Sequence, residues 1–247
     1  MAYALLRQPG APVGRVGHRG AKGHAPENTF ASFNRGYEIG VQAVETDVHL
    51  SKDGELIVMH DHTVDRTTNG HGFIKDLTLA ELKQLDAGSW FDPQFAGEQV
   101  PTLRELLAWA VDRVPVAIEI KNGPIYYPGI AGKVIDLLRE FAMLDKAIVI
   151  SFDHLVLREA KLIEPQVVTG ILYVGGLVDP VSAARLAGAA SLNPHWAYIT
   201  PAMIEEAHAA GIAVSAWNPN DLPTIRMLAH MGVDSIGSDF PDLFEQI

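Results

Sequence analysis

The chain has 247 residues, of which 48% are hydrophobic and 20% are charged, a composition typical of a folded globular protein and not of a disordered one. Its 30 acidic residues outnumber its 19 basic residues, and the net charge of -11 argues against a nucleic-acid partner, because phosphate backbones are bound by clustered Lys and Arg. The absence of cysteine excludes disulfides, thiolate catalysis and cysteine-ligated zinc. Any chemistry must therefore come from carboxylates, histidines, hydroxyls or a bound cofactor.

Residues 1–17 contain neither a basic segment leading into a long apolar stretch nor the roughly 20 apolar residues that span a bilayer. We therefore expect a cytoplasmic protein with no stable membrane insertion. A homo-oligomer is compatible with the sequence, which fixes no oligomeric state.

Nine short apolar runs predict β-strands along the whole chain. They lie at residues 13–17, 43–48, 55–59, 116–120, 147–152, 167–174, 189–192, 212–217 and 235–237. Helical patterns separate most of them, and their N-terminal capping signals are Asn28 or Thr29, Thr102 with Glu105, Asp153, Asp179, Thr200 and Asp221.

The second and third runs are separated by only a few residues, too few for the crossover that parallel neighbours need. We therefore expect a β-hairpin that turns at Asp53 and Gly54. The remaining eight strands predict an α/β fold, a (β/α)8 TIM barrel. We expect one domain over residues 1–247, with an insertion at residues 50–100 after the second barrel strand, which includes a short helix opened by a capping box at Thr78 and Glu81.

Three carboxylates are expected to converge at the carboxyl ends of the barrel strands, where the catalytic groups of such barrels lie. Glu45 and Asp47 are two residues apart in one strand and so point to the same face, as do Glu119 and Lys121 in the next barrel strand. Three uncompensated acids would repel one another, so we predict that they bind Mg²⁺ or Ca²⁺, which prefer oxygen ligands. The alternative is that the acids are solvated, or paired with Lys121 and Arg19.

Two histidines follow apolar strands beside this carboxylate cluster. His18 and His60 would supply the base and the acid of a hydrolytic reaction, because imidazole titrates near neutrality. A structural role for both stays open on these grounds alone. Arg19 and Lys121 add positive charge that suits an anionic group such as a phosphate. The other eight histidines are interpreted as surface or core residues.

These residues lie in motifs that resemble those of the glycerophosphodiester phosphodiesterase family of the bacterial cytosolic type. The similar segments are HRGAKGHAPENT at residues 18–29, ETDV at 45–48, KDG at 52–54, VMHD at 58–61, DRTTNG at 65–70, LDAGSWF at 85–91, VPTL at 100–103, EIK at 119–121, and GVD, SD and PD between residues 232 and 242. The resemblance covers nearly the whole chain. The sequence departs from the family where Ser51 and Ser238 replace the more common Thr, and where AWN at residues 216–218 replaces a Thr-Val-Asn segment.

The resemblance implies a function and assigns roles to the residues already singled out. It implies hydrolysis of a small-molecule glycerophosphodiester to sn-glycerol 3-phosphate and an alcohol such as choline, ethanolamine or glycerol. The implied roles are metal binding for Glu45, Asp47 and Glu119, acid–base catalysis for His18 and His60, and phosphate contacts for Arg19 and Lys121. Trp217, at the end of the seventh barrel strand, is also expected to bind the substrate. Glu27 and Asn28 are expected to line or brace the site, with Asn28 acting as a helix cap.

Three other functions compete with this interpretation. A glycoside hydrolase also uses paired carboxylates in a barrel, but two histidines and two cations suit a metal–phosphate site better. A lysophospholipase D or a phospholipase-C-like enzyme would share the same core and would need an apolar lane for an acyl chain. The candidate lane residues are Trp90, Phe91, Phe95, Tyr126, Tyr127 and Trp196. A non-catalytic binding module is disfavoured because every catalytic position is intact.

Overall fold

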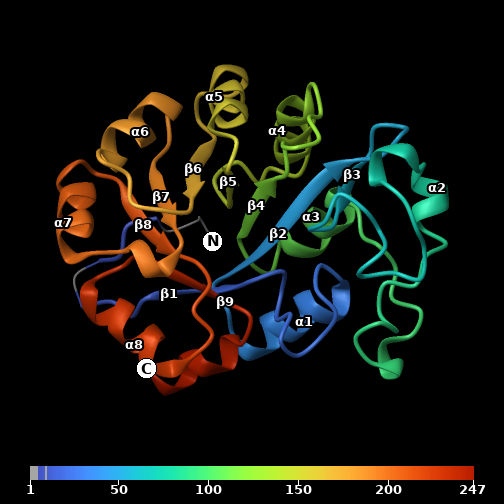
Figure 1. Cartoon of the computed structure of the whole chain (residues 1–247), viewed down its shortest axis with the longest axis horizontal. Helices are drawn as coiled ribbons and strands as arrows, with labels where there is room; N and C mark the ends of the chain where they lie inside the picture. The colour runs from blue at the N-terminus through green and yellow to red at the C-terminus, as the bar shows by residue number, and fades with distance from the viewer. Residues whose placement is uncertain (1–4, 9) are drawn as a thin grey trace.

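The strands form one nine-stranded sheet in the computed structural model, which describes residues 5–8 and 10–247. They are β1 (Gly14–Gly17), β2 (Ala43–Leu50), β3 (Leu56–Val58), β4 (Val116–Ile120), β5 (Ala147–Ser151), β6 (Val168–Tyr173), β7 (Ser191–Pro194), β8 (Ala213–Ala216) and β9 (Ser235–Ser238). All except β3 run parallel, and β1 pairs with both β2 and β9, which closes the sheet. The predicted (β/α)8 TIM barrel is confirmed, with its helices outside the strands (Figure 1).

The predicted hairpin is the antiparallel pair of β2 and β3. Leu50 pairs with Leu56, and the chain turns back through the intervening residues, where Gly54 has a φ of 83° that glycine adopts without strain. Strand β3 lies outside the barrel ring, at the end of the sheet order next to β2. Because β3 is short, it runs back along β2 only as far as Asp47, whose carbonyl accepts from the Met59 backbone N–H at 3.1 Å, and His60 follows beside this part of β2.

The described helices are α1 (Phe30–Ile39), α2 (Leu79–Leu82), α3 (Leu103–Ala110), α4 (Ile130–Glu140), α5 (His154–Ile163), α6 (Pro180–Ala187), α7 (Pro201–Ala209) and α8 (Leu222–Met231). Most of the predicted capping residues are confirmed, including the capping box of Thr102 and Glu105 on α3. The expectation that Asn28 caps α1 is wrong, because Thr29 accepts the hydrogen bond from the Ser32 amide. None of the helices in the described part of the chain has the length and apolar character needed to cross a bilayer.

The segment between β3 and α3 forms a small structure beside the barrel, on the right of Figure 1. It contains α2, with the predicted capping box of Thr78 and Glu81, and two 3₁₀ turns at Ile74–Asp76 and Pro93–Phe95. Its apolar side chains pack with Ile57 of β3 in a cluster separate from the main core: Met59, Val64, Ile74, Leu82, Ala87 and Val100. This packing gives the segment a fixed shape against β3, so the loops it carries can position side chains at the barrel mouth.

A buried histidine on β2 holds the chain where it leaves β3. His49 is fully buried, and its Nε2 lies 3.1 Å from the backbone carbonyl oxygen of His60. A carbonyl only accepts, so Nε2 carries the proton, and Nδ1 accepts from the Tyr127 hydroxyl at 3.2 Å. Burial lowers the pKa of His49 from 6.5 to about 4, which keeps the ring neutral near pH 7.

This histidine predicts part of the acid sensitivity of the fold. Between pH 6.5 and pH 4 the unfolded chain binds a proton on His49 that the folded chain excludes, so stability falls as the pH drops through this window. At pH 5 the loss from this one group is about 2 kcal/mol. His49→Gln keeps an N–H donor for the His60 carbonyl and does not titrate, so it should lose less stability than the wild type between pH 7.5 and pH 5. Urea unfolding at both pH values measures the difference, and equal losses in both proteins would contradict it.

Candidate active site

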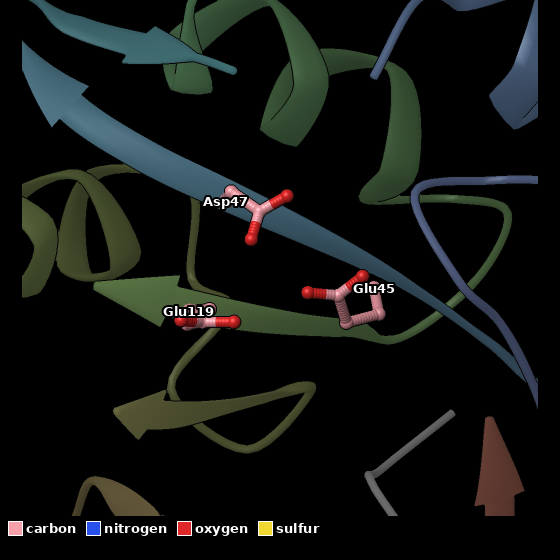
Figure 2. Close-up of side chains that lie close together, drawn as sticks. All are labelled: Glu45, Asp47 and Glu119. Atoms are coloured by element: carbon pink, nitrogen blue, oxygen red, sulfur yellow. The ribbon is translucent and has the colours of Figure 1, made fainter. Parts of the chain in front are cut away.

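Three carboxylates gather inside the barrel mouth on two neighbouring strands. Glu45 and Asp47 project from β2 and Glu119 from β4, and Asp47 is paired with Glu119 across the sheet. One oxygen of each carboxylate lies within 4.8 Å of the others (Figure 2). All three side chains are buried, so water screens their repulsion poorly. The predicted convergence of these acids is present in the structure.

The protonation behaviour of the cluster reflects this crowding. Burial, together with the nearby Asp47 and Glu119 charges, raises the pKa of Glu45 well above its ordinary value, and burial raises the pKa of Glu119 to about 7. Burial opposes ionisation of Asp47 too, but Lys121 and Arg19 outweigh it and hold the pKa of Asp47 well below its usual range. The protein's own cations therefore stabilise only part of the negative charge that the cluster carries when it is fully ionised.

The cluster has the donor set of a divalent cation site. It offers three carboxylates and no nitrogen or sulfur ligand, the set that hard ions such as Mg²⁺ and Ca²⁺ prefer. Among the described residues Asp47 Oδ1 accepts no hydrogen bond, although the Lys121 ammonium lies 3.0 Å away. Buried carboxylate oxygens are normally saturated with donors. An ion-binding role accounts for the oxygen that lacks one, so the residues fit a divalent metal ion.

Two cations flank the carboxylates. Lys121 Nζ lies 2.6 Å from Glu119 Oε1, and Arg19 Nε lies 3.2 Å from Asp47 Oδ2. Arg19 has a positive φ of 49°, which lets its backbone N–H donate to Glu45 Oε2 at 3.0 Å. Salt bridging of Arg19 and Lys121 to the acids, the alternative raised by the sequence, is therefore also present. It leaves donors over, because Arg19 Nη2 has no hydrogen-bond partner among the described residues.

The two histidines are arranged alike. His18 Nδ1 lies 2.5 Å from Asp239 Oδ1, and His60 Nδ1 lies 2.7 Å from Asp61 Oδ1. A carboxylate on Nδ1 fixes the ring and favours the tautomer whose Nε2 is an unprotonated acceptor. Burial lowers the pKa of both rings, that of His18 to about 4, against the opposing effect of each carboxylate. Each histidine thus keeps an Nε2 available for proton transfer.

The structure adds a supporting residue, Arg66, to which the sequence analysis assigned no role. Arg66, from the segment after β3, contacts Asp61 through Nε at 2.7 Å and Glu27 through Nη2 at 2.7 Å. Glu27 also accepts from Arg19 Nη1 at 2.8 Å, so Arg66 links the residues that follow β3 to the motif at residues 18–29. The bracing role expected for Asn28 takes another form: its amide donates to Asp47 Oδ2 at 2.9 Å. These residues lie inside the motifs, but spacing alone gives them no partner.

One cavity of about 430 Å³ collects the predicted residues. Its lining includes His18, Arg19, Glu45, His60, Glu119, Lys121 and Trp217. Asp47 is fully buried beneath it, in contact with both cations. The same cavity is also lined by His195, which the sequence analysis interpreted as a surface or core residue, and by Asn218, Asn220 and Asp239, to which it assigned no role. Of the six aromatic residues considered for an acyl lane, only Tyr126 lines this cavity or the one beside it.

Comparison with known proteins places this site in a family. The model of the glycerophosphoryl diester phosphodiesterase family matches residues 18–243. A glycerophosphodiester phosphodiesterase from Caldanaerobacter subterraneus is 42% identical over 228 residues, which cover 92% of this chain and 94% of the relative.

Two solved structures extend the comparison. The glycerophosphodiester phosphodiesterase of Agrobacterium tumefaciens has a TM-score of 0.85 at 33% identity, covering 95% of this chain and 100% of that one. A phosphodiesterase of Oleispira antarctica, in complex with the product sn-glycerol-3-phosphate, has a TM-score of 0.84 at 30% identity, covering 95% and 96%. The chain therefore belongs to the glycerophosphoryl diester phosphodiesterase family and is an enzyme of that family.

Proposed function

We propose that the protein hydrolyses glycerophosphodiesters to sn-glycerol 3-phosphate and an alcohol such as choline, ethanolamine or glycerol, and that the reaction requires a divalent metal ion. One observation carries the proposal: three carboxylates, two cations and two carboxylate-bound histidines gather at one cavity. The product bound to the Oleispira antarctica relative supports the same class of substrate. A cytoplasmic location stays a prediction from the sequence, which is compatible with a homo-oligomer and fixes no oligomeric state.

Glu45, Asp47 and Glu119 are the residues that would hold the metal ion, Mg²⁺ or Ca²⁺. When bound, such an ion polarises a phosphoryl oxygen and neutralises developing negative charge. Around the ion, Asn28 fixes the orientation of Asp47 through its amide. The backbone N–H of Arg19 does the same for Glu45. These contacts keep the oxygens in place before any ion binds, which reduces the entropy lost on binding.

Arg19 and Lys121 are positioned to bind the phosphate of the substrate. Each already contacts a buried carboxylate, so each side chain is held in one orientation. The guanidinium of Arg19 retains Nη2, and the ammonium of Lys121 has three N–H donors for its two carboxylate partners. A phosphate oxygen at the cavity can accept these remaining donors in charge-assisted hydrogen bonds.

His18 and His60 supply the proton transfers. In the neutral ring an unprotonated Nε2 takes the proton of the attacking hydroxyl, and a protonated Nε2 gives one to the departing alcohol oxygen. Asp239 and Asp61 stabilise the imidazolium form of their partners, and the negative charge of a bound phosphate diester favours that form further. Trp217, fixed by its Nε1–H donating to the Asn193 carbonyl at 2.8 Å, presents its ring to the substrate in the same cavity.

The alternative of a lysophospholipase D or phospholipase-C-like enzyme is not favoured. Such an activity needs a continuous apolar lane for an acyl chain, and the candidate aromatic residues do not gather beside the site. Tyr127 is buried against His49, and Phe91 contacts Phe95 and Trp90 within the segment after β3. Lysophosphatidylcholine is the substrate that distinguishes this activity from the proposed one.

Metal-stripped protein should release no sn-glycerol 3-phosphate from glycerophosphocholine until a divalent ion is added, because the clustered carboxylates need its charge. A coupled assay for sn-glycerol 3-phosphate, with Mg²⁺, Ca²⁺ or Mn²⁺ added in turn, measures this. Glu119→Ala should also raise the ion concentration that gives half of the maximal rate. Full activity in excess chelator would refute the metal requirement, and faster turnover of lysophosphatidylcholine would favour the alternative.

Substituting either histidine should remove turnover without unfolding the protein. His18→Ala and His60→Ala should each lower kcat about 10²–10⁴-fold, the usual effect of losing a positioned acid or base. The double variant should be little slower than either single variant, because both residues serve one transfer. His71→Ala, whose side chain is 88% exposed in the segment after β3, is the control and should match the wild type. Independent, multiplicative losses would show that one histidine has only a structural role.

The carboxylate behind His60 gives a prediction about pH. Asp61 raises the pKa of His60 against the effect of burial, so Asp61→Asn should move the basic limb of the kcat/KM profile, where His60 loses the proton that it gives to the departing alcohol, to lower pH. It should also lower kcat at least about tenfold, because the ring loses its orienting partner. Asp65→Asn, an exposed carboxylate nearby in the same segment, is the matched control. A profile with an unshifted basic limb would show that Asp61 does not act through His60.

A further inference from the structure

The active-site cavity has a second cavity beside it. The second cavity has a volume of about 770 Å³, and the two share His60, Glu119, Lys121 and Phe152 in their walls. Phe152 lines both cavities and packs edge-on against Trp217 of the active-site cavity, with 5.6 Å between ring centroids. A group bound at His60, Glu119 and Lys121 therefore has open space on two sides.

A phosphodiester needs this arrangement. Its phosphorus carries two alcohol arms, and displacement proceeds roughly in line, so the leaving oxygen departs opposite the attacking oxygen. The first cavity suits the glycerol arm, because Asn218 lines it with a side-chain amide that forms no hydrogen bond to another described residue and is free to bind hydroxyls. The second cavity is then the space for the alcohol that leaves.

The walls of the second cavity are aromatic. Phe73 comes from the segment after β3, Tyr126 from the connection between β4 and α4, and Phe152 from the start of the connection between β5 and α5. Their exposed fractions are 44%, 68% and 47%, high for large rings. Lys75 lies over the ring of Phe73 at 5.5 Å, whereas no cation of the described residues lies over the rings of Tyr126 and Phe152. Open aromatic rings attract organic cations through their π-systems.

The charges in this cavity favour a cation as well. Lys121 forms ion pairs with Asp47 and Glu119, and Asp61 forms one with Arg66. Asp153 forms no ion pair within residues 5–8 and 10–247; its oxygens accept from the Asn122 amide at 2.6 Å and from the Leu155 backbone at 3.0 Å. The cavity wall thus carries one carboxylate whose charge no side-chain cation of the described chain neutralises.

We propose that Phe73, Tyr126, Phe152 and Asp153, which we term the aromatic cleft, bind the leaving alcohol and select one that carries an ammonium group. This proposal rests on the proposed function and adds the chemical class of the alcohol. Tyr126 and Phe152 contact the ammonium group, Asp153 supplies the compensating charge, and Phe73 forms the outer wall. His60, which lines both cavities, lies where the ester oxygen of this alcohol leaves.

The test compares two diesters that share the glycerophosphate and differ in the alcohol: glycerophosphocholine and glycerophosphoglycerol. The wild type should have the higher kcat/KM for glycerophosphocholine. Tyr126→Ala and Asp153→Asn should each lower the ratio of the two kcat/KM values about 3- to 30-fold, and Tyr126→Phe should restore most of it. Asn keeps an acceptor for the first turn of α5. Tyr198→Ala is the control, since this tyrosine is 45% exposed and lines neither cavity.

Tetramethylammonium ion gives a second readout that needs no alcohol chemistry. It should compete with glycerophosphocholine in the wild type and more weakly in Tyr126→Ala. Equal losses on both diesters in Tyr126→Ala, or an unchanged ratio in both variants, would overturn the aromatic cleft while leaving the proposed function intact. If the wild type releases sn-glycerol 3-phosphate from neither diester, the proposed function itself fails.

Discussion

The structure depends on one electrostatic constraint: three carboxylates are buried side by side. Parallel pairing of β2 with β4 sets Asp47 opposite Glu119, and alternation along β2 places Glu45 on the same face. Each buried charge is costly unless it is paired or bound to an ion. The contacts of Arg19 and Lys121 with Asp47 reduce the electrostatic cost of this burial.

The burial of these carboxylates also affects the backbone of the motif at residues 18–29, which contains Arg19. Arg19 adopts a positive φ, with its backbone N–H donating to Glu45. Gly20 follows it with a φ of 90° and lies so close to Ser32 that a Cβ would be 2.5 Å from the backbone of α1. The Ser32 hydroxyl donates to the Arg19 carbonyl and ties the start of α1 to the turn. The glycine is therefore required by helix packing as well as by the turn.

Local signals predicted most of the fold and the polar residues of the site. The short link after β2 forced a hairpin, capping residues such as Thr102 marked helix starts, and strand ends identified His18 and Lys121. Partners far apart in the chain could not be predicted in this way. Asp239 lies 221 residues from His18, so no spacing rule connects them. Asn28 was assigned as a cap because Asn commonly caps helices, but Asp47 needed its amide and the adjacent Thr29 was available for the helix.

The segment after β3 supplies residues both to the catalytic site and to the cleft proposed to bind the leaving alcohol. It supplies Arg66, which holds Asp61 behind His60, and Phe73, which forms the outer wall of the aromatic cleft. Its own apolar cluster fixes both side chains relative to β3. The carboxylate cluster lies on β2 and β4 and makes no use of Phe73, so changes of side chain in the cleft can alter the alcohol accepted without disturbing the metal ligands. Changes at Arg66 would disturb the site, because Arg66 also binds Glu27, which in turn binds Arg19. The shape of this segment therefore constrains both the leaving group and the catalytic histidine beside it.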